Sequence, residues 1–194
     1  MISRLKGTLL TRDLDTVEVE TPGGVVYEVE VPATVMEHLP LPGEALELRT
    51  VQVVREDSQA LYGFRTQKEQ ELFKRLLTAS GVGAKLALAM LSAFSASRLA
   101  QALAQRDLTA LTQVSGVGKK KAERISLELS EKVQDLALAP EEGAERAPSA
   151  DGAVSALMAL GFSFTAADEA VRQVLKEDGD LPTEDLVRKA LARS

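Results

Sequence analysis

The chain has 194 residues, of which 45% are hydrophobic and 27% charged, and it contains no Cys and one His. Without Cys the chain cannot form disulfides, thiolate zinc sites or iron–sulfur clusters, and one His excludes His-based triads and multi-His metal sites. The longest apolar run, at 86–91, is much shorter than the ~18 residues that a membrane-spanning helix needs. The N-terminus lacks the continuous apolar core of a signal peptide. We therefore expect a cytoplasmic protein without a membrane segment, a metal or a cofactor.

The formal net charge is −6, but the charges are unevenly distributed. Residues 1–64 carry five basic and eleven acidic side chains, whereas residues 65–134 carry twelve basic and six acidic ones. Binding to a polyanion depends on the local field of one surface. The acidic total therefore does not exclude a nucleic-acid partner for the second segment.

Residues 1–64 have the period-two apolar spacing of strands, separated by turn signals at 22–24 and 42–43. The alternating stretches lie at 16–20, 25–31, 46–48 and 51–54, and residues 32–39 suit one short helix. About five short strands and one helix predict a five-stranded OB-fold barrel. Glu56 and Asp57 lie between two strand-like runs and are predicted to occupy a hairpin tip.

After Phe64 the pattern becomes helical. Thr66 and Glu69 form a capping-box sequence at the start of the first helix. Further helices are predicted at about 84–92, 96–105, 108–114 and 119–133, which makes residues 65–134 an all-α domain. Residues 135–152 have the composition of a flexible linker. Residues 153–194 are predicted to form a three-helix module, with helices near 153–160, 166–177 and 184–192. The chain is thus a multidomain α+β protein.

The helical segment contains an internal repeat. Residues 80–87 align with residues 115–122 at an offset of 35, and six of eight positions are identical. Each copy reads helix, Gly-Val-Gly turn, helix, so unpaired amides and the positive dipole end of the second helix face outward. This arrangement can bind a phosphate. The residues predicted to do so are Gly81, Val82, Gly83 and Lys85 in the first copy, and Gly116, Val117, Gly118, Lys119 and Lys120 in the second. Neither copy is a nucleotide-binding P-loop.

These paired helix–hairpin–helix copies, together with Val53–Phe64, closely resemble the RuvA family of Holliday-junction-binding proteins. The opening Met1–Gly7 and the late Ala156–Phe162 are similar to that family too. The resemblance implies a homotetrameric platform that holds a four-way DNA junction open and square-planar, independently of sequence. It adds Arg124 to the phosphate-binding residues. Two residues depart from the commonest pattern: Ala84 stands where Pro is frequent, and Lys121 is an extra cation.

For the hairpin tip, the resemblance implies that Glu56 and Asp57 form an acidic pin at the junction centre. Carboxylates beside phosphates would help to separate strands and would disfavour plain duplex. For the C-terminal module, it implies docking of the hexameric ATPase RuvB, through a region that contains Leu157, Leu160, Gly161, Phe162 and Leu186. The chain itself would then be a non-catalytic subunit, and the junction resolvase RuvC would be a further partner. Whether one tetramer or two bind a junction stays open.

Two other classes of protein share part of this pattern. A structure-specific nuclease or repair enzyme could use the hairpins only for docking, with Asp13, Asp15, Glu18 and Glu20 as the best carboxylate cluster for Mg²⁺. Their spacing across a turn and an alternating strand favours solvated surface. A pure protein adaptor with a ubiquitin-associated-like tail would leave the duplicated hairpin unexplained.

Overall fold

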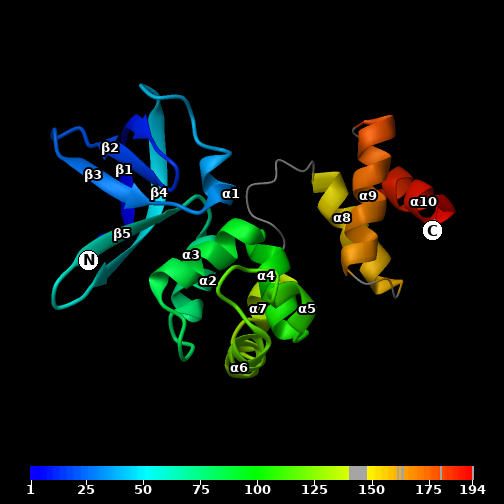
Figure 1. The fold of residues 1–194 in the computed structure, drawn as a ribbon. Helices are drawn as coiled ribbons and strands as arrows, with labels where there is room; N and C mark the ends of the chain where they lie inside the picture. The colour runs from blue at the N-terminus through cyan, green and yellow to red at the C-terminus, as the bar shows by residue number, and fades with distance from the viewer. Residues whose placement is uncertain (140–147, 161, 163, 180, 194) are drawn as a thin grey trace. The chain divides into compact units, whose positions relative to one another are not determined.

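The computed structural model describes residues 1–139, 148–160, 162, 164–179 and 181–193. The chain divides into two compact units, Met1–Glu142 and Gly143–Ser194. Figure 1 shows the strands and helices in chain order. Over the described ranges no single helix is long and apolar enough to cross a bilayer. Two successive helices, Ala84–Ala93 and Ala96–Ala104, reach that length and apolar composition only together, and the chain bends by 105° between them.

The first unit begins with a closed five-stranded barrel, as the alternating apolar pattern predicted. Its strand order is β1-β2-β3-β5-β4, with β3 and β5 parallel and the other neighbours antiparallel. The barrel core is filled by side chains such as Leu9, Val19, Val29 and Leu48. The elements are β1 (Arg4–Arg12), β2 (Thr16–Glu20), β3 (Val26–Glu30), α1 (Ala33–Met36), β4 (Ala45–Val54) and β5 (Gln59–Phe64).

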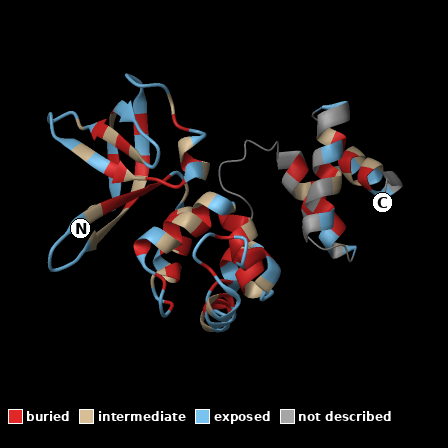
Figure 2. Ribbon diagram, in the orientation of Figure 1, coloured by how far each residue is buried: buried red, intermediate tan, exposed pale blue. Residues whose placement is uncertain are grey.

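Six helices follow in the same unit, and their apolar faces make a second core. The capping box at Thr66 is confirmed: its hydroxyl oxygen accepts from the Glu69 amide at 3.1 Å, and Glu69 accepts from the Thr66 amide at 2.9 Å. Figure 2 shows buried residues recurring along these helices. Leu72, Phe73 and Ile125 are among the side chains of this core. The helices are α2 (Gln67–Leu76), α3 (Ala84–Ala93), α4 (Ala96–Ala104), α5 (Leu108–Leu111), α6 (Lys119–Leu129) and α7 (Gln134–Leu138).

The barrel and the helices share one interface inside the first unit. The ring of Phe73 on α2 lies 5.0 Å from the ring of Tyr62 and 4.9 Å from that of Phe64, both on β5. The side-chain amide nitrogen of Gln70, on α2, donates to the buried backbone carbonyl of Thr50, on β4, at 2.8 Å. The predicted boundary at residue 64 is therefore a change of secondary structure and not a separation in space.

The predicted linker at 135–152 differs from the structure at both ends. Residues 134–138 form α7, which packs on α4, because Leu136 is buried in the helical core. At the other end the helix α8 (Pro148–Ala159) begins before the predicted residue 153, because Ala150 already joins the core of the second unit. The central part of the predicted linker, 140–147, lies outside the described residues.

The second unit is a three-helix module, as predicted. It consists of α8, α9 (Phe164–Asp178) and α10 (Thr183–Arg193). All three helices contribute to its core, with Leu157 from α8, Val171 and Val174 from α9, and Leu186 from α10. The module thus has an apolar core of its own.

Candidate nucleic-acid interface

The first hairpin joins α2 to α3. Gly81 has φ +77°, a conformation that residues with a Cβ rarely adopt, and Gly83 is the extended N-cap of α3. Between them the Val82 side chain is buried, and its amide donates to the carbonyl of Ala79 at 3.1 Å. The chain therefore turns sharply around an anchored valine and enters α3 at once.

The second hairpin, between α5 and α6, repeats this geometry. Gly116 has φ +83°, and Gly118 is the extended N-cap of α6. Val117 is buried, and its amide donates to the carbonyl of Val114 at 3.0 Å. The repeat read from the sequence is thus also a repeat in backbone conformation.

Both hairpins present a helix N-terminus that no side chain caps. Gly83 and Gly118 offer no side-chain oxygen, so the amides in the first turns of α3 and α6 have no capping partner. The dipole of each helix adds positive potential at the same point. Each hairpin can therefore accept an anion such as a DNA phosphate.

The lysines beside the two hairpins are not equivalent. Lys85, Lys119 and Lys120 are exposed, and among the described residues they form no ion pair or side-chain hydrogen bond. Lys121, the extra cation of the sequence, instead donates from Nζ to the carbonyl oxygen of Gly116 at 3.0 Å. Three lysines therefore remain available to phosphates, whereas the fourth is engaged by its own hairpin.

The two hairpins lie next to each other. A Cβ built at Gly116 would lie 3.8 Å from Cδ1 of Leu86 on α3. Lys85 and Ser115 line the same groove, whose volume is about 530 Å³. The Arg124 side chain of α6 reaches the first hairpin, because a Cβ built at Gly81 would collide with its guanidinium group. The structure thus gathers the predicted phosphate-binding residues of both copies on one region.

One carboxylate that the sequence did not single out also belongs to this region. Oε2 of Glu128, on α6, accepts from the backbone amide of Ser80 at 2.8 Å. This hydrogen bond lowers the pKa of the Glu128 carboxyl, and the charges of Arg124 and Lys132 contribute in the same direction. Glu128 has no counterpart in the repeat, so no local pattern could have indicated its contact 48 residues away.

The predicted acidic tip is an exposed turn. Glu56 and Asp57 lie between β4 and β5, and the turn is closed by the Arg55 amide, which donates to the Ser58 carbonyl at 2.8 Å. Figure 1 shows this hairpin extending away from the barrel. A Cβ built at Gly83 would lie 3.9 Å from the Arg55 guanidinium, so the base of the acidic hairpin adjoins the Gly81–Gly83 hairpin.

The residues predicted for partner docking are split by the structure. Leu157 is 1% and Leu186 0% exposed, so both side chains belong to the core of the module that carries the predicted docking region. Leu160 is 61% exposed and Phe162 is partly buried. Gly161 lies outside the described residues. Leu160 is therefore the most accessible of the four that the structure describes.

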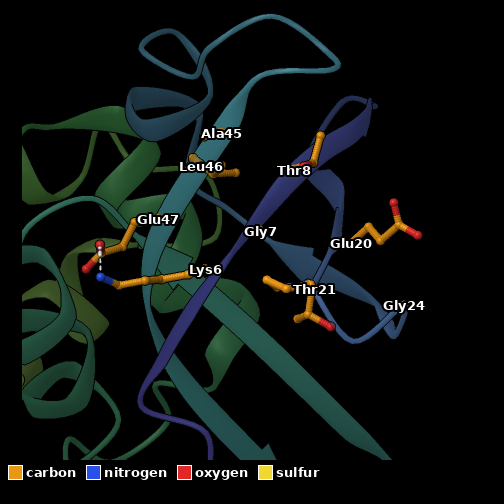
Figure 3. Close-up of a pocket in the computed structure, with 10 residues that line it drawn as sticks. Lys6, Gly7, Thr8, Glu20, Thr21, Gly24, Ala45, Leu46 and Glu47 are labelled. Carbon is orange, nitrogen blue, oxygen red and sulfur yellow. Dashed lines mark ion pairs between the residues drawn. The ribbon is translucent and has the colours of Figure 1, made fainter.

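A second hollow, of about 750 Å³, lies on the barrel and is shown in Figure 3. Its Lys6 is paired with Glu47 at 2.8 Å, so this cation is already neutralised. Two of the four carboxylates considered for a nuclease make local hydrogen bonds: Glu18 accepts from the Thr11 hydroxyl and Asp13 from the Leu14 amide. In the part of the chain that the structure describes, no three His, Cys, Asp or Glu side chains are grouped to hold a metal ion.

Comparison with known proteins matches the whole length of the chain. Residues 1–63 match the model of the RuvA N terminal domain, residues 73–131 that of the SAM-like helix-hairpin-helix tandem, and residues 150–194 that of the RuvA C-terminal domain. A Gemmatimonas aurantiaca protein named Holliday junction branch migration complex subunit RuvA is 45% identical, covering 100% of this chain and 98% of its own length. Two proteins with the same name are each 41% identical to this chain. The alignment with the Pseudomonas fluorescens protein covers 98% of both chains, and the alignment with the Ralstonia nicotianae protein covers 100% of both.

Proposed function

The chain belongs to the RuvA family, and from this we propose that it binds four-way DNA junctions as the DNA-binding subunit of a branch-migration complex. The observation that carries the proposal is the pair of matching hairpins, at Gly81–Gly83 and Gly116–Gly118, side by side in one unit. Each offers uncapped amides, and exposed lysines stand beside both.

Two adjacent anion sites suit a nucleic-acid backbone better than a single small anion. Phosphates recur along each strand, so the hairpins can bind two of them from one DNA arm at once, which multiplies the affinity. Lys85, Lys119, Lys120 and Arg124 supply the compensating charge. Contacts of this kind read no base edges, so binding is independent of sequence and weakens steeply as salt rises.

Phosphate binding by the two hairpins does not by itself favour a junction over a linear duplex. The acidic hairpin supplies that preference. We assign the chain to a homotetramer in which four copies bind the four arms and hold the junction open and square-planar. The tips with Glu56 and Asp57 would meet the strands at the crossover. Their carboxylates repel phosphates, which keeps strands apart there and disfavours a continuous duplex. Arg55 beside them limits that repulsion.

The chain acts in this scheme as an accessory, non-catalytic subunit. Movement of the junction is driven by the hexameric ATPase RuvB, which docks on the second unit, where Leu160 offers an exposed apolar side chain. RuvC, the junction resolvase, is a further partner on the same DNA. The place of action is the cytoplasm, where the bacterial chromosome lies.

A competition gel shift tests the proposal. The full-length chain is mixed with a labelled synthetic four-way junction and an excess of unlabelled linear duplex, over a range of salt and Mg²⁺ concentrations. Retention of the junction complex without cleavage supports a structure-specific binder. Equal competition by duplex would reduce the chain to a general DNA-docking module, and Mg²⁺-dependent cleavage would instead indicate a nuclease.

A further inference from the structure

Helix α6 carries a line of polar side chains that contacts both hairpins. Lys121, Arg124 and Glu128 are spaced three and four residues apart, so they lie along one face of the helix. Lys121 binds the Gly116 carbonyl of the second hairpin, Arg124 lies over Gly81 of the first, and Glu128 accepts from the Ser80 amide at 2.8 Å. One helix therefore holds both turns.

The contact of Glu128 is placed where it can control the shape of the first hairpin. The amide it accepts belongs to Ser80, immediately before Gly81 with its left-handed backbone. An accepting oxygen 2.8 Å from that amide nitrogen fixes the direction of the peptide group. Nearby, Lys132 donates to the hydroxyl of Thr78 at 3.4 Å, which adds a second link to the same turn, from the turn that follows α6.

The second hairpin is held differently. Ser115 matches Ser80 in the repeat, and within the described residues no side chain accepts from the Ser115 amide. The Lys121–Gly116 contact takes that role instead. The repeat is therefore asymmetric, and the first hairpin depends on a residue that belongs to the helix of the second.

We infer that Glu128 is a positioning residue for the first phosphate-binding hairpin, holding it in the shape and spacing that let both hairpins bind one DNA arm together. This inference rests on the proposed junction binding. A hairpin ordered before binding loses less freedom when it binds, so its phosphate contact contributes more affinity. Without the Glu128–Ser80 hydrogen bond, the first hairpin would contribute less to DNA affinity, and the two hairpins together would bind more like a single site.

The direction in which junction affinity changes distinguishes a positioning role of Glu128 from simple charge repulsion. A carboxylate near DNA repels phosphates, so removal of a merely repulsive acid strengthens binding. Glu128→Ala removes both the charge and the acceptor, and Glu128→Gln removes only the charge. Glu128→Asp keeps the charge but draws the acceptor back from the Ser80 amide. Glu123, exposed on the same helix and without an ion pair among the described residues, provides the matched control as Glu123→Ala.

The experiment is a fluorescence-anisotropy titration of a labelled four-way junction with the full-length variants at several salt concentrations. We expect Glu128→Ala and Glu128→Asp to bind roughly fivefold more weakly, Glu128→Gln to bind at least as tightly as the unaltered chain, and Glu123→Ala to bind more tightly. The plot of log affinity against log salt should be flatter for Glu128→Ala, by up to ~0.9 for one lost phosphate.

Double variants show which of the two hairpins the Glu128 substitution weakens. Lys85→Ala should cost clearly less affinity in the Glu128→Ala background than in the unaltered chain, whereas Lys120→Ala should cost the same in both. Equal or tighter junction binding by Glu128→Ala, or equal costs of Lys85→Ala in both backgrounds, would overturn the inference while leaving junction binding in place. Failure of the unaltered chain to bind the junction would instead remove the proposed function on which it rests.

Discussion

The side-chain nitrogen of Lys121 donates to the carbonyl oxygen of Gly116 at 3.0 Å, so the third lysine of the Lys119–Lys121 run is turned back onto its own hairpin. Its neighbours Lys119 and Lys120 are exposed and make no such contact in the described part of the chain. Three consecutive lysines that look equivalent in the sequence therefore have two different roles.

This difference can be measured as a difference in salt dependence. Lys120→Met should lower junction affinity and reduce the slope of log affinity against log salt by ~0.9, because one phosphate contact is lost. Lys121→Met should leave that slope nearly unchanged, since the ammonium group is held by the Gly116 carbonyl. Isothermal titrations at four salt concentrations give both slopes. Equal reductions for the two variants would show that Lys121 also reaches the DNA.

The backbone conformation of Gly116 makes a second prediction. Its φ is +83°, so Gly116→Ala places a Cβ in the left-handed region and should lower the free energy of unfolding by about 1–2 kcal/mol. Gly118 has φ −82° and open space around it, so Gly118→Ala carries no left-handed strain and should cost less than Gly116→Ala. Urea unfolding of both variants provides the comparison. A larger loss for Gly118→Ala would contradict the assigned turn geometry.

The features that the sequence predicted are those set by local chemistry. The hairpins follow from Gly-x-Gly spacing, the barrel from period-two alternation, and the start of α2 from a capping box whose two partners are three residues apart. The contacts of Arg124 with Gly81 and of Glu128 with Ser80 join positions more than forty residues apart and leave no periodic trace. Helix α7 was missed because its five residues resemble the polar, Ala-rich linker that follows.

The acidic tip is predicted to control selectivity more than affinity. Neutralising it as Glu56→Gln with Asp57→Asn removes repulsion, so duplex affinity should rise more than junction affinity, and the junction-to-duplex preference should fall several-fold. A matched double variant at Glu28 on β3 and Glu37 at the end of α1, both exposed acids, controls for net charge. Competition gel shifts measure both ratios. An unchanged preference would refute the acidic-pin role.

The ion pair between Arg75 on α2 and Asp135 on α7 should make stability depend on pH. The guanidinium donates to Asp135 Oδ2 at 2.8 Å, and this hydrogen bond lowers the pKa of the Asp135 carboxyl below its ordinary 3.8. A lowered pKa means stabilisation that is complete at neutral pH and is lost as pH falls below about 3.8 toward the folded-state value. Because Asp135 is 65% exposed, the contribution is within about 1 kcal/mol.

The variant Asp135→Asn tests this ion pair. Its unfolding midpoint in urea should lie below that of the unaltered chain at pH 7 and pH 5, and the gap should shrink as the pH falls below about 3.8. Glu131→Gln, at an exposed acid in the preceding turn, controls for the loss of one negative charge. A gap that does not shrink at all below pH 3.8 would show that Asp135 stabilises α7 through something other than its charge.

The second unit is predicted to serve the motor and not the DNA. A chain ending at residue 142 retains the whole first unit, including both hairpins, so its junction affinity should stay within about twofold of the full-length value while its stimulation of the RuvB ATPase disappears. A truncation that loses junction binding would refute this division of roles.

A point variant sharpens the same test. Leu160 is 61% exposed, so Leu160→Ser should weaken RuvB stimulation without unfolding the module, because a surface substitution leaves the core packing intact. Leu186 is fully buried, and Leu186→Ser should instead unfold the module by leaving a cavity and a buried hydroxyl. ATPase assays on junction DNA, read beside circular dichroism of each variant, separate the two. Normal stimulation by a folded Leu160→Ser chain would place the docking surface elsewhere on the module.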